Sequence, residues 1–106
     1  MILPERVRSQ WLRLFASRPE VQRAIVFGSR ARGDAEPRSD VDLIILAPEA
    51  TPEQWVDLWY KLKEDSETLL AIDVFRWEEA SEELKQRVLA DGEVLYERSK
   101  DCPKPG

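Results

Sequence analysis

The sequence predicts an α/β domain of the α+β two-layer kind, in which flanking helices cover one small, mixed β-sheet. Two observations lead to this fold class. The chain has 106 residues, 42% hydrophobic and 35% charged, a length and balance typical of one globular domain. Short apolar runs alternate along it with amphipathic segments, an order that favours helices packed on a sheet. We therefore expect one domain over residues 1–98 and a disordered polar tail over residues 99–106.

The chain opens with a predicted helix over residues 4–18 and a predicted strand over residues 22–27. In the helix, apolar side chains recur at the spacing of one helical face, at Val7, Trp11, Leu14 and Phe15. Pro19 ends this helix because proline has no backbone N–H to donate. The strand, QRAIVF, is a short apolar run closed by Gly28, which indicates that it is buried.

The middle of the chain combines a turn with a second strand. Residues 29–32 are long enough for one helical turn, and residues 33–39 have the glycine, proline and serine content of a return loop. Residues 40–46, DVDLIIL, predict a strand that carries two aspartates. The first half of the chain thus offers two strands joined by a polar turn.

The second half of the chain predicts two further helices, each followed by a strand. Thr51 and Pro52 are typical of a helix start, and this helix runs to about residue 65 with an apolar face of Trp55, Leu58, Trp59 and Leu62. Residues 69–76, LLAIDVFR, predict the third strand, and residues 93–97 predict the fourth. The last helix, over residues 81–92, carries Leu84, Val88 and Leu89. We expect core packing, with a partner-binding surface as the alternative, for Trp11, Trp55 and Trp59.

Composition and charge exclude several classes of function. The net charge of -5 opposes bulk binding to a nucleic-acid backbone, and no apolar run approaches the ~18 residues of a membrane span. The first residues lack the pattern of an export signal, so we expect a cytoplasmic protein. The chain has no histidine and a single cysteine, Cys102, which excludes histidine catalysis and an internal disulfide. Any metal must therefore be held by oxygen ligands, which favours Mg2+ or Mn2+.

Two aspartates of the second strand are the first candidates for a metal site. Asp40 and Asp42 lie two residues apart, so their side chains point to the same face of a strand. Val41 then points to the opposite face. Two carboxylates this close repel each other, and a divalent cation between them relieves the repulsion.

Asp73 is the one charged residue in the apolar run LLAIDVF of the third strand. If this strand neighbours the one that carries Asp40 and Asp42, Asp73 completes a metal site of three carboxylates. The alternative is an acid near a strand end that points to water. We favour the metal site because burial of an unpaired charge in a strand costs several kcal/mol of folding free energy.

Gly28 and Ser29 are candidates for a phosphate site. Glycine lets a backbone approach a ligand closely, and the helical turn that follows presents free N–H groups and the positive end of its dipole. The Ser29 hydroxyl adds one more donor. The arginines of the same stretch are either holders of a small anion or solvated surface charges: Arg30, Arg32 and Arg38.

The combined pattern resembles a known family. Gly28-Ser29 is followed after ten residues by Asp40-Val41-Asp42 and later by Asp73, which is similar to the DNA polymerase β-type nucleotidyltransferase superfamily. The short length and the GSRARG start resemble its minimal, single-domain members, which are often encoded beside a helical HEPN protein in prokaryotic toxin–antitoxin pairs. The resemblance spans most of the chain and implies the nucleotidyltransferase fold.

The resemblance also implies an activity. The catalytic residues, which would bind two Mg2+ ions with Mn2+ as the alternative, are Asp40, Asp42 and Asp73. The residues that would bind the nucleotide phosphates, with ATP as the expected donor, are Gly28, Ser29 and Arg32. The chain would then be an antitoxin that transfers AMP to a tyrosine of its HEPN partner.

Three other functions stay open on the sequence alone. The chain could be the nucleotide-binding half of an aminoglycoside-type, small-molecule nucleotidyltransferase. It could be a non-catalytic antitoxin that blocks its toxin by occupancy, although an intact set of aspartates has no use in such a module. A DNA polymerase is least favoured, because the acidic balance and the absence of a template-binding domain oppose it.

Overall fold

The computed structural model describes residues 3–28, 40–66, 68 and 70–98. Its elements in chain order are the helix α1 Glu5–Ala16, the strands β1 Arg23–Phe27 and β2 Val41–Leu46, the helix α3 Pro52–Glu64, the strand β3 Ile72–Arg76, the short 3-10 helix η1 Trp77–Glu79, the helix α4 Glu82–Asp91 and the strand β4 Glu93–Glu97. The turn predicted at residues 29–32, the loop at residues 33–39 and the disordered tail at residues 99–106 lie outside the described residues.

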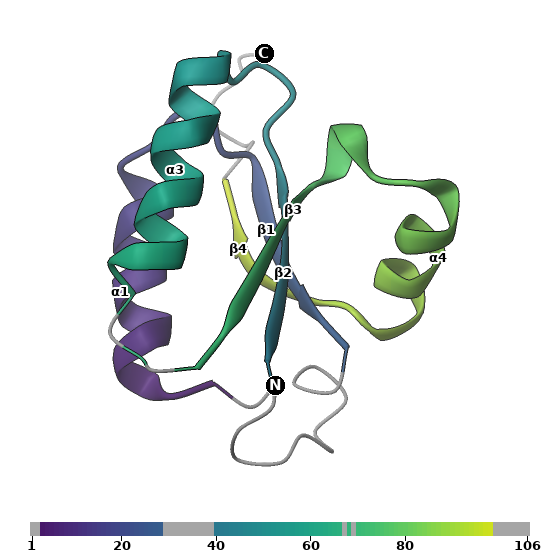
Figure 1. Cartoon of the computed structure of the whole chain (residues 1–106), viewed down its shortest axis with the longest axis horizontal. Coiled ribbons are helices and arrows are strands. Elements are labelled where there is room, and N and C mark those ends of the chain that lie inside the picture. Colours follow the sequence, from purple (N-terminus) through teal and green to yellow (C-terminus); the bar gives the residue numbers. More distant parts are fainter. Residues whose placement is uncertain (1–2, 29–39, 67, 69, 99–106) are drawn as a thin grey trace.

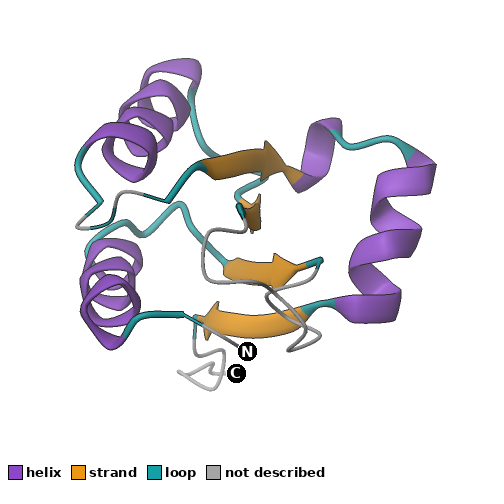
Figure 2. Cartoon of the chain, turned by 60° about the horizontal axis from the view of Figure 1, so that its bottom comes forward, coloured by secondary structure: helices purple, strands orange, loops and turns teal. Residues whose placement is uncertain are grey.

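Within the described part of the chain, the strands form one four-stranded sheet in the order β3-β2-β1-β4. The strand β1 pairs antiparallel with both β2 and β4. The strands β2 and β3, which α3 connects along the chain, pair in parallel. Helices α1 and α3 cover one face of this sheet, and α4 lies on the other side (Figures 1 and 2). The predicted fold class, a small mixed sheet with flanking helices, is confirmed.

The main core lies between the sheet and the pair α1 and α3. The period-2 alternation of β2 and the helical periodicity of α1 and α3 send apolar side chains into this layer. Each of these is at most 1% exposed: Val7, Trp11, Phe15, Val41, Leu43, Ile45, Leu58 and Leu62. The prediction that Val41 points away from Asp42 is thereby confirmed, and Leu43 and Ile45 lie on the same face as Val41.

A smaller apolar cluster lies between the opposite face of the sheet and α4. Its buried members are Ile25, Phe27, Ile44 and Val88. The rings of Phe27 and Phe75 lie 5.8 Å apart between their centroids and extend this cluster toward β3. The α4 face thus has a small apolar core of its own. The polar residues of β2 and β3 lie at its border.

One predicted core position, Trp59, is wrong. Trp11 is buried and Trp55 packs partly buried against the main core, but Trp59 is 38% exposed. It lies at the margin of the apolar face of α3. The Lys63 ammonium lies over its ring, 5.6 Å from the centroid, in a cation–π contact. Leu89, at 71% exposed, lies on the outer face of α4. Helical spacing identifies an apolar stripe but does not say where its margin lies.

The start of α3 follows the predicted chemistry. The Thr51 Oγ1 atom accepts a hydrogen bond from the backbone N–H of Gln54 at 3.1 Å, and the Gln54 side chain accepts one from the N–H of Thr51 at 2.8 Å. This reciprocal pair, with Pro52 at the first helical position, fixes where α3 begins after β2. No helix among the described residues is both long and apolar enough to cross a membrane.

Candidate active site

The parallel pairing of β2 and β3 places Asp42 beside Asp73. The two residues are partners in the strand register, and their carboxyl groups lie within hydrogen-bonding reach of each other. Both lie on the α4 face, because their neighbours Val41, Ile72 and Val74 pack into the opposite core. We call Asp42 and Asp73 the acid pair. The condition on which the predicted role of Asp73 depended, that its strand neighbours β2, is met.

Asp40 flanks the acid pair. It is exposed and directly precedes β2, two residues before Asp42, and its charge acts on the Asp42 carboxyl. Among the described residues, no three Asp, Glu, Cys or His side chains are arranged to hold one metal ion together. The fold therefore assembles a pair of carboxylates with a third at its border, and the role of Asp40 as a ligand stays a prediction.

Gly28 lies against Asp42 and needs to be glycine for two reasons. Its φ of +79° is in the left-handed region, which residues with a Cβ rarely adopt. A Cβ placed on it would also lie 2.5 Å from the Oδ2 atom of Asp42. Because Phe27 faces Asp42 in the register of β1 and β2, the next residue, Gly28, lies directly beside Asp42. Gly28 thus lies against Asp42, and its approach to a phosphate stays a prediction.

Electrostatics oppose a second negative charge in the acid pair. Burial raises the pKa of the Asp42 carboxyl above its usual 3.8, and the charges of Asp73 and Asp40 raise this pKa further. The guanidinium of Arg87 acts in the opposite direction and lowers it, but the net shift is upward. The fold thus holds Asp42 where its ionised form is costly unless a cation joins the site.

Arg87 is a residue of this site that the sequence did not reveal. It lies on α4, is exposed, and its guanidinium carbon lies 5.9 Å from the centroid of the Phe27 ring. This position brings a cation near Asp42 from an element more than forty residues later in the chain. An arginine on the polar face of a helix carries no sequence signal that separates it from solvated charges.

The donors of the site suit a hard divalent cation. All of them are carboxylate oxygens, which Mg2+ and Mn2+ prefer over nitrogen or sulfur. The mutual repulsion of Asp42 and Asp73 and the raised pKa of Asp42 are both relieved when a cation lies between the two carboxylates. The residues present therefore fit the metal that the sequence predicted.

The predicted phosphate residues are only partly described. Gly28 is in place at the end of β1, beside the acid pair. The other residues proposed for anion binding lie outside the described residues: Ser29, Arg30, Arg32 and Arg38. Their roles remain predictions from the sequence.

One protein family matches the chain. The profile of the family described as "Polymerase beta, Nucleotidyltransferase" matches residues 10–101, which include every described candidate of the site. No curated protein matches the chain significantly in sequence.

Several solved structures share the fold. A toxin–antitoxin structure with AMP-PNP is 28% identical, and the match covers 93% of this chain and 77% of that one, with a TM-score of 0.66. A mutant form of an MntA toxin–antitoxin complex is 25% identical over 94% of this chain and 77% of that one, with a TM-score of 0.68. A tri-AMPylated HEPN toxin from Shewanella oneidensis in complex with its MNT antitoxin is 24% identical over 87% and 71% of the two chains, with a TM-score of 0.61. The last of these is evidence for the fold alone.

Proposed function

We infer the function of this chain from one premise: it belongs to the polymerase β-type nucleotidyltransferase family, whose profile matches residues 10–101. We propose that it transfers AMP from ATP to a hydroxyl group of a protein, that the acceptor is a tyrosine of a helical, HEPN-type toxin, and that this modification makes the chain an antitoxin. The observation that carries the proposal is the acid pair, held on the α4 face with Gly28 directly against Asp42.

The similar structures support the choice of donor and partner. The structure that is 28% identical contains AMP-PNP, an ATP analogue, and is a toxin–antitoxin complex. The MntA complex at 25% identity is also a toxin–antitoxin pair. ATP as donor and a toxin as partner are therefore the first hypotheses to test for this chain. With ATP as donor, we expect the reaction to take place in the cytoplasm.

We assign the metal to the carboxylates Asp40, Asp42 and Asp73. When bound, two Mg2+ ions, or Mn2+ in their place, would neutralise charge on the phosphates and make the acceptor hydroxyl more acidic. The chain itself contributes the position of these oxygens: the β2 and β3 register fixes the acid pair, and Gly28 allows the Oδ2 atom of Asp42 its place beside the turn.

We assign the phosphates of ATP to the turn after β1 and to α4. The backbone at Gly28, the Ser29 hydroxyl and the Arg32 guanidinium would bind them from the turn. Arg87 would add a cation from α4, since its guanidinium lies over Phe27 and its charge acts on Asp42. A triphosphate bound here would be oriented with its α-phosphate toward the acid pair.

The proposed reaction exchanges one bond at the α-phosphorus for another. The acceptor oxygen forms a bond to the α-phosphorus while the bond from this phosphorus to the bridging oxygen of the β-phosphate breaks. Pyrophosphate leaves, and the hydroxyl proton passes to the Asp73 carboxylate and then to water. The position of the Asp73 side chain supports this role, since it lies on the α4 face beside Asp42, at the start of the edge strand.

Intact-mass spectrometry tests the proposal. A HEPN-type partner protein would be incubated with this chain, ATP and Mg2+, and in parallel with an Asp42→Asn variant. We expect additions of one or more AMP groups on the partner, on tyrosine, and none with the variant. A stable complex without added mass would support a non-catalytic antitoxin, and transfer to an aminoglycoside instead of the protein would support the small-molecule enzyme.

A further inference from the structure

The strand β3 forms an open edge of the sheet. In a parallel pair, alternate residues turn their backbone groups to the neighbouring strand. The Ala71 carbonyl accepts the N–H of Val41 at 2.9 Å, so Asp73 and Phe75 also face β2, and the backbone of Ile72, Val74 and Arg76 faces outward. No described strand pairs with this outer side. It therefore offers a row of hydrogen-bonding groups.

Part of this row is already covered, and part is available. The outward carbonyl of Ile72 accepts a hydrogen bond from the Nζ atom of Lys63 at 2.7 Å. Val74, the central residue of β3, turns both its N–H and its carbonyl to the outside, and no described residue bonds to them. An added strand would pair with the edge through this donor and this acceptor of Val74.

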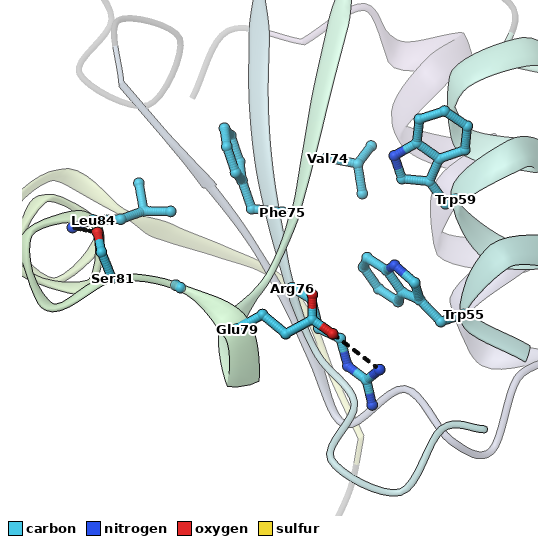
Figure 3. Close-up of a pocket in the computed structure, with 9 residues that line it drawn as sticks. Trp55, Trp59, Val74, Phe75, Arg76, Glu79, Ser81 and Leu84 are labelled. Atoms are coloured by element: carbon cyan, nitrogen blue, oxygen red, sulfur yellow. Dashed lines mark hydrogen bonds and ion pairs between the residues drawn. The ribbon is translucent and has the colours of Figure 1, made fainter. Parts of the chain in front are cut away.

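Side chains on both sides of this edge form a groove, in which apolar residues are joined by Arg76, Glu79 and Ser81. Figure 3 shows Trp55 and Trp59 from α3 on one side of β3, and Phe75 with Leu84 of α4 on the other. The cavity between them measures about 280 Å³. We call it the β3 groove. Trp59, which is 38% exposed, lines this groove and offers apolar area that a bound segment would cover.

The β3 groove is lined by the two residues that follow Asp73 in the strand, Val74 and Phe75. In an added strand, alternate side chains would face the α4 side, where Asp73 and Phe75 lie, and the others would face Trp55 and Trp59. A hydroxyl side chain that reaches Asp73 would thus have its sequence neighbours against the tryptophan wall.

We propose that the β3 groove binds the acceptor as an extended polypeptide segment, paired with the outer edge of β3, with the modified hydroxyl residue facing Asp73 and an apolar residue next to it facing Trp59. The inference rests on the proposed function, because it takes the acceptor to be a polypeptide. The strand edge would give affinity through main-chain hydrogen bonds. The residues on both sides of the groove would give specificity by contacting alternate side chains of the bound segment. The reacting bonds are those already given: the hydroxyl oxygen joins the α-phosphorus as pyrophosphate leaves.

The test uses short synthetic peptides with one central tyrosine and systematically varied neighbours. Each peptide is incubated with the full chain, ATP and Mg2+, and AMP addition is measured by mass. Hydrogen exchange of the Val74 amide is measured with and without peptide, in the absence of nucleotide. Trp59→Ala removes the wall, and Tyr60→Ala is the matched control, because Tyr60 is the next residue of α3, is 57% exposed and does not line the groove.

We expect peptides with an apolar residue beside the tyrosine to be modified in preference and to slow exchange of the Val74 amide. Trp59→Ala should weaken both effects by about tenfold and leave the affinity for Mg·ATP unchanged. Tyr60→Ala should leave all three quantities unchanged. Equal modification whatever the neighbours, or equal losses in the two variants, would overturn the proposal.

The two proposals fail in different ways. If the chain binds Mg·ATP but no peptide slows exchange of the Val74 amide, the β3 groove is not the acceptor site, whereas the proposed activity stands. If the chain binds no Mg·ATP, the proposed activity fails. The exchange measurement, made without nucleotide, then still decides whether the groove binds an extended peptide.

Discussion

The two faces of the sheet differ in what their burial achieves. On the α1 and α3 face, the apolar residues of every strand and of both helices join one large buried cluster. On the α4 face, the buried cluster is small and gives way to Asp42, Asp73 and the Arg87 guanidinium. One face is consistent at every level from periodicity to packing. On the other face, charged groups take the place of apolar packing and lower its contribution to stability, which is typical of functional sites.

The largest expected effect concerns chemistry on the α4 face. Asp42→Asn removes a charge from the acid pair while it keeps the shape of the side chain, and we expect transfer of AMP to fall roughly a thousandfold, since the metal contributes several kcal/mol to the transition state. The rate of AMP addition in a single turnover measures this. Glu64→Gln, at the exposed end of α3, is the control and should retain the wild-type rate. Loss of activity in both variants would contradict a local role of the acid pair.

The next effect compares the stability of the two faces on one strand. Leu43 and Ile44 are neighbours in β2, both fully buried, and they point to opposite faces. We expect Leu43→Ala to lower the free energy of unfolding by roughly 3–5 kcal/mol and Ile44→Ala by about 2–3 kcal/mol, because the smaller cluster under α4 has more room to collapse. Urea unfolding measures both. A larger loss in Ile44→Ala would reverse our ranking of the two faces.

A third effect concerns the contact between the Gly28 turn and the site. Gly28→Ala puts a Cβ on a residue with a φ of +79° and within 2.5 Å of the Asp42 Oδ2 atom. We expect a loss of about 1–2 kcal/mol in stability from the backbone conformation, together with weaker Mg·ATP binding as the Asp42 carboxylate is displaced. Calorimetry with Mg·ATP and thermal unfolding of the same variant separate the two consequences. Unchanged binding would show that the turn tolerates a side chain.

The smallest effect is the stability that Asp42 itself removes. Its pKa is raised in the folded chain above the usual 3.8, so the folded state keeps a proton that the unfolded state has lost, and stability falls as the pH rises through this window. Below both pKa values the penalty is absent, and above the folded one it is complete. Without divalent metal, Asp42→Asn should therefore raise the melting temperature slightly at neutral pH and leave it unchanged near about pH 3. Melting curves of both proteins between these limits measure the difference. A variant that melts lower at neutral pH would contradict the penalty.

The sequence predicted the features that depend on neighbouring residues better than those that depend on contacts between distant segments. The alternation of side chains in the second strand and the start of α3 after Thr51 follow from local patterns, and the structure confirms both, with the strand at Val41–Leu46. The adjacency of Asp42 and Asp73 was conditional, because alternating helices and strands do not state which strands are neighbours. Arg87 was missed because its role depends on where α4 packs, and Trp59 was misplaced because periodicity does not locate the margin of an apolar face.

The measurement that tests the central claim most directly is calorimetric titration of ATP into this chain and into Asp42→Asn, each with Mg2+ and with a chelator. If the acid pair is a site for a metal-bound triphosphate, the wild type binds ATP with Mg2+, and loses about tenfold or more in affinity either when Mg2+ is removed or when Asp42 is replaced. Equal ATP affinity in all four titrations would contradict the account, because the α4 face would then have no metal-dependent nucleotide site built on Asp42.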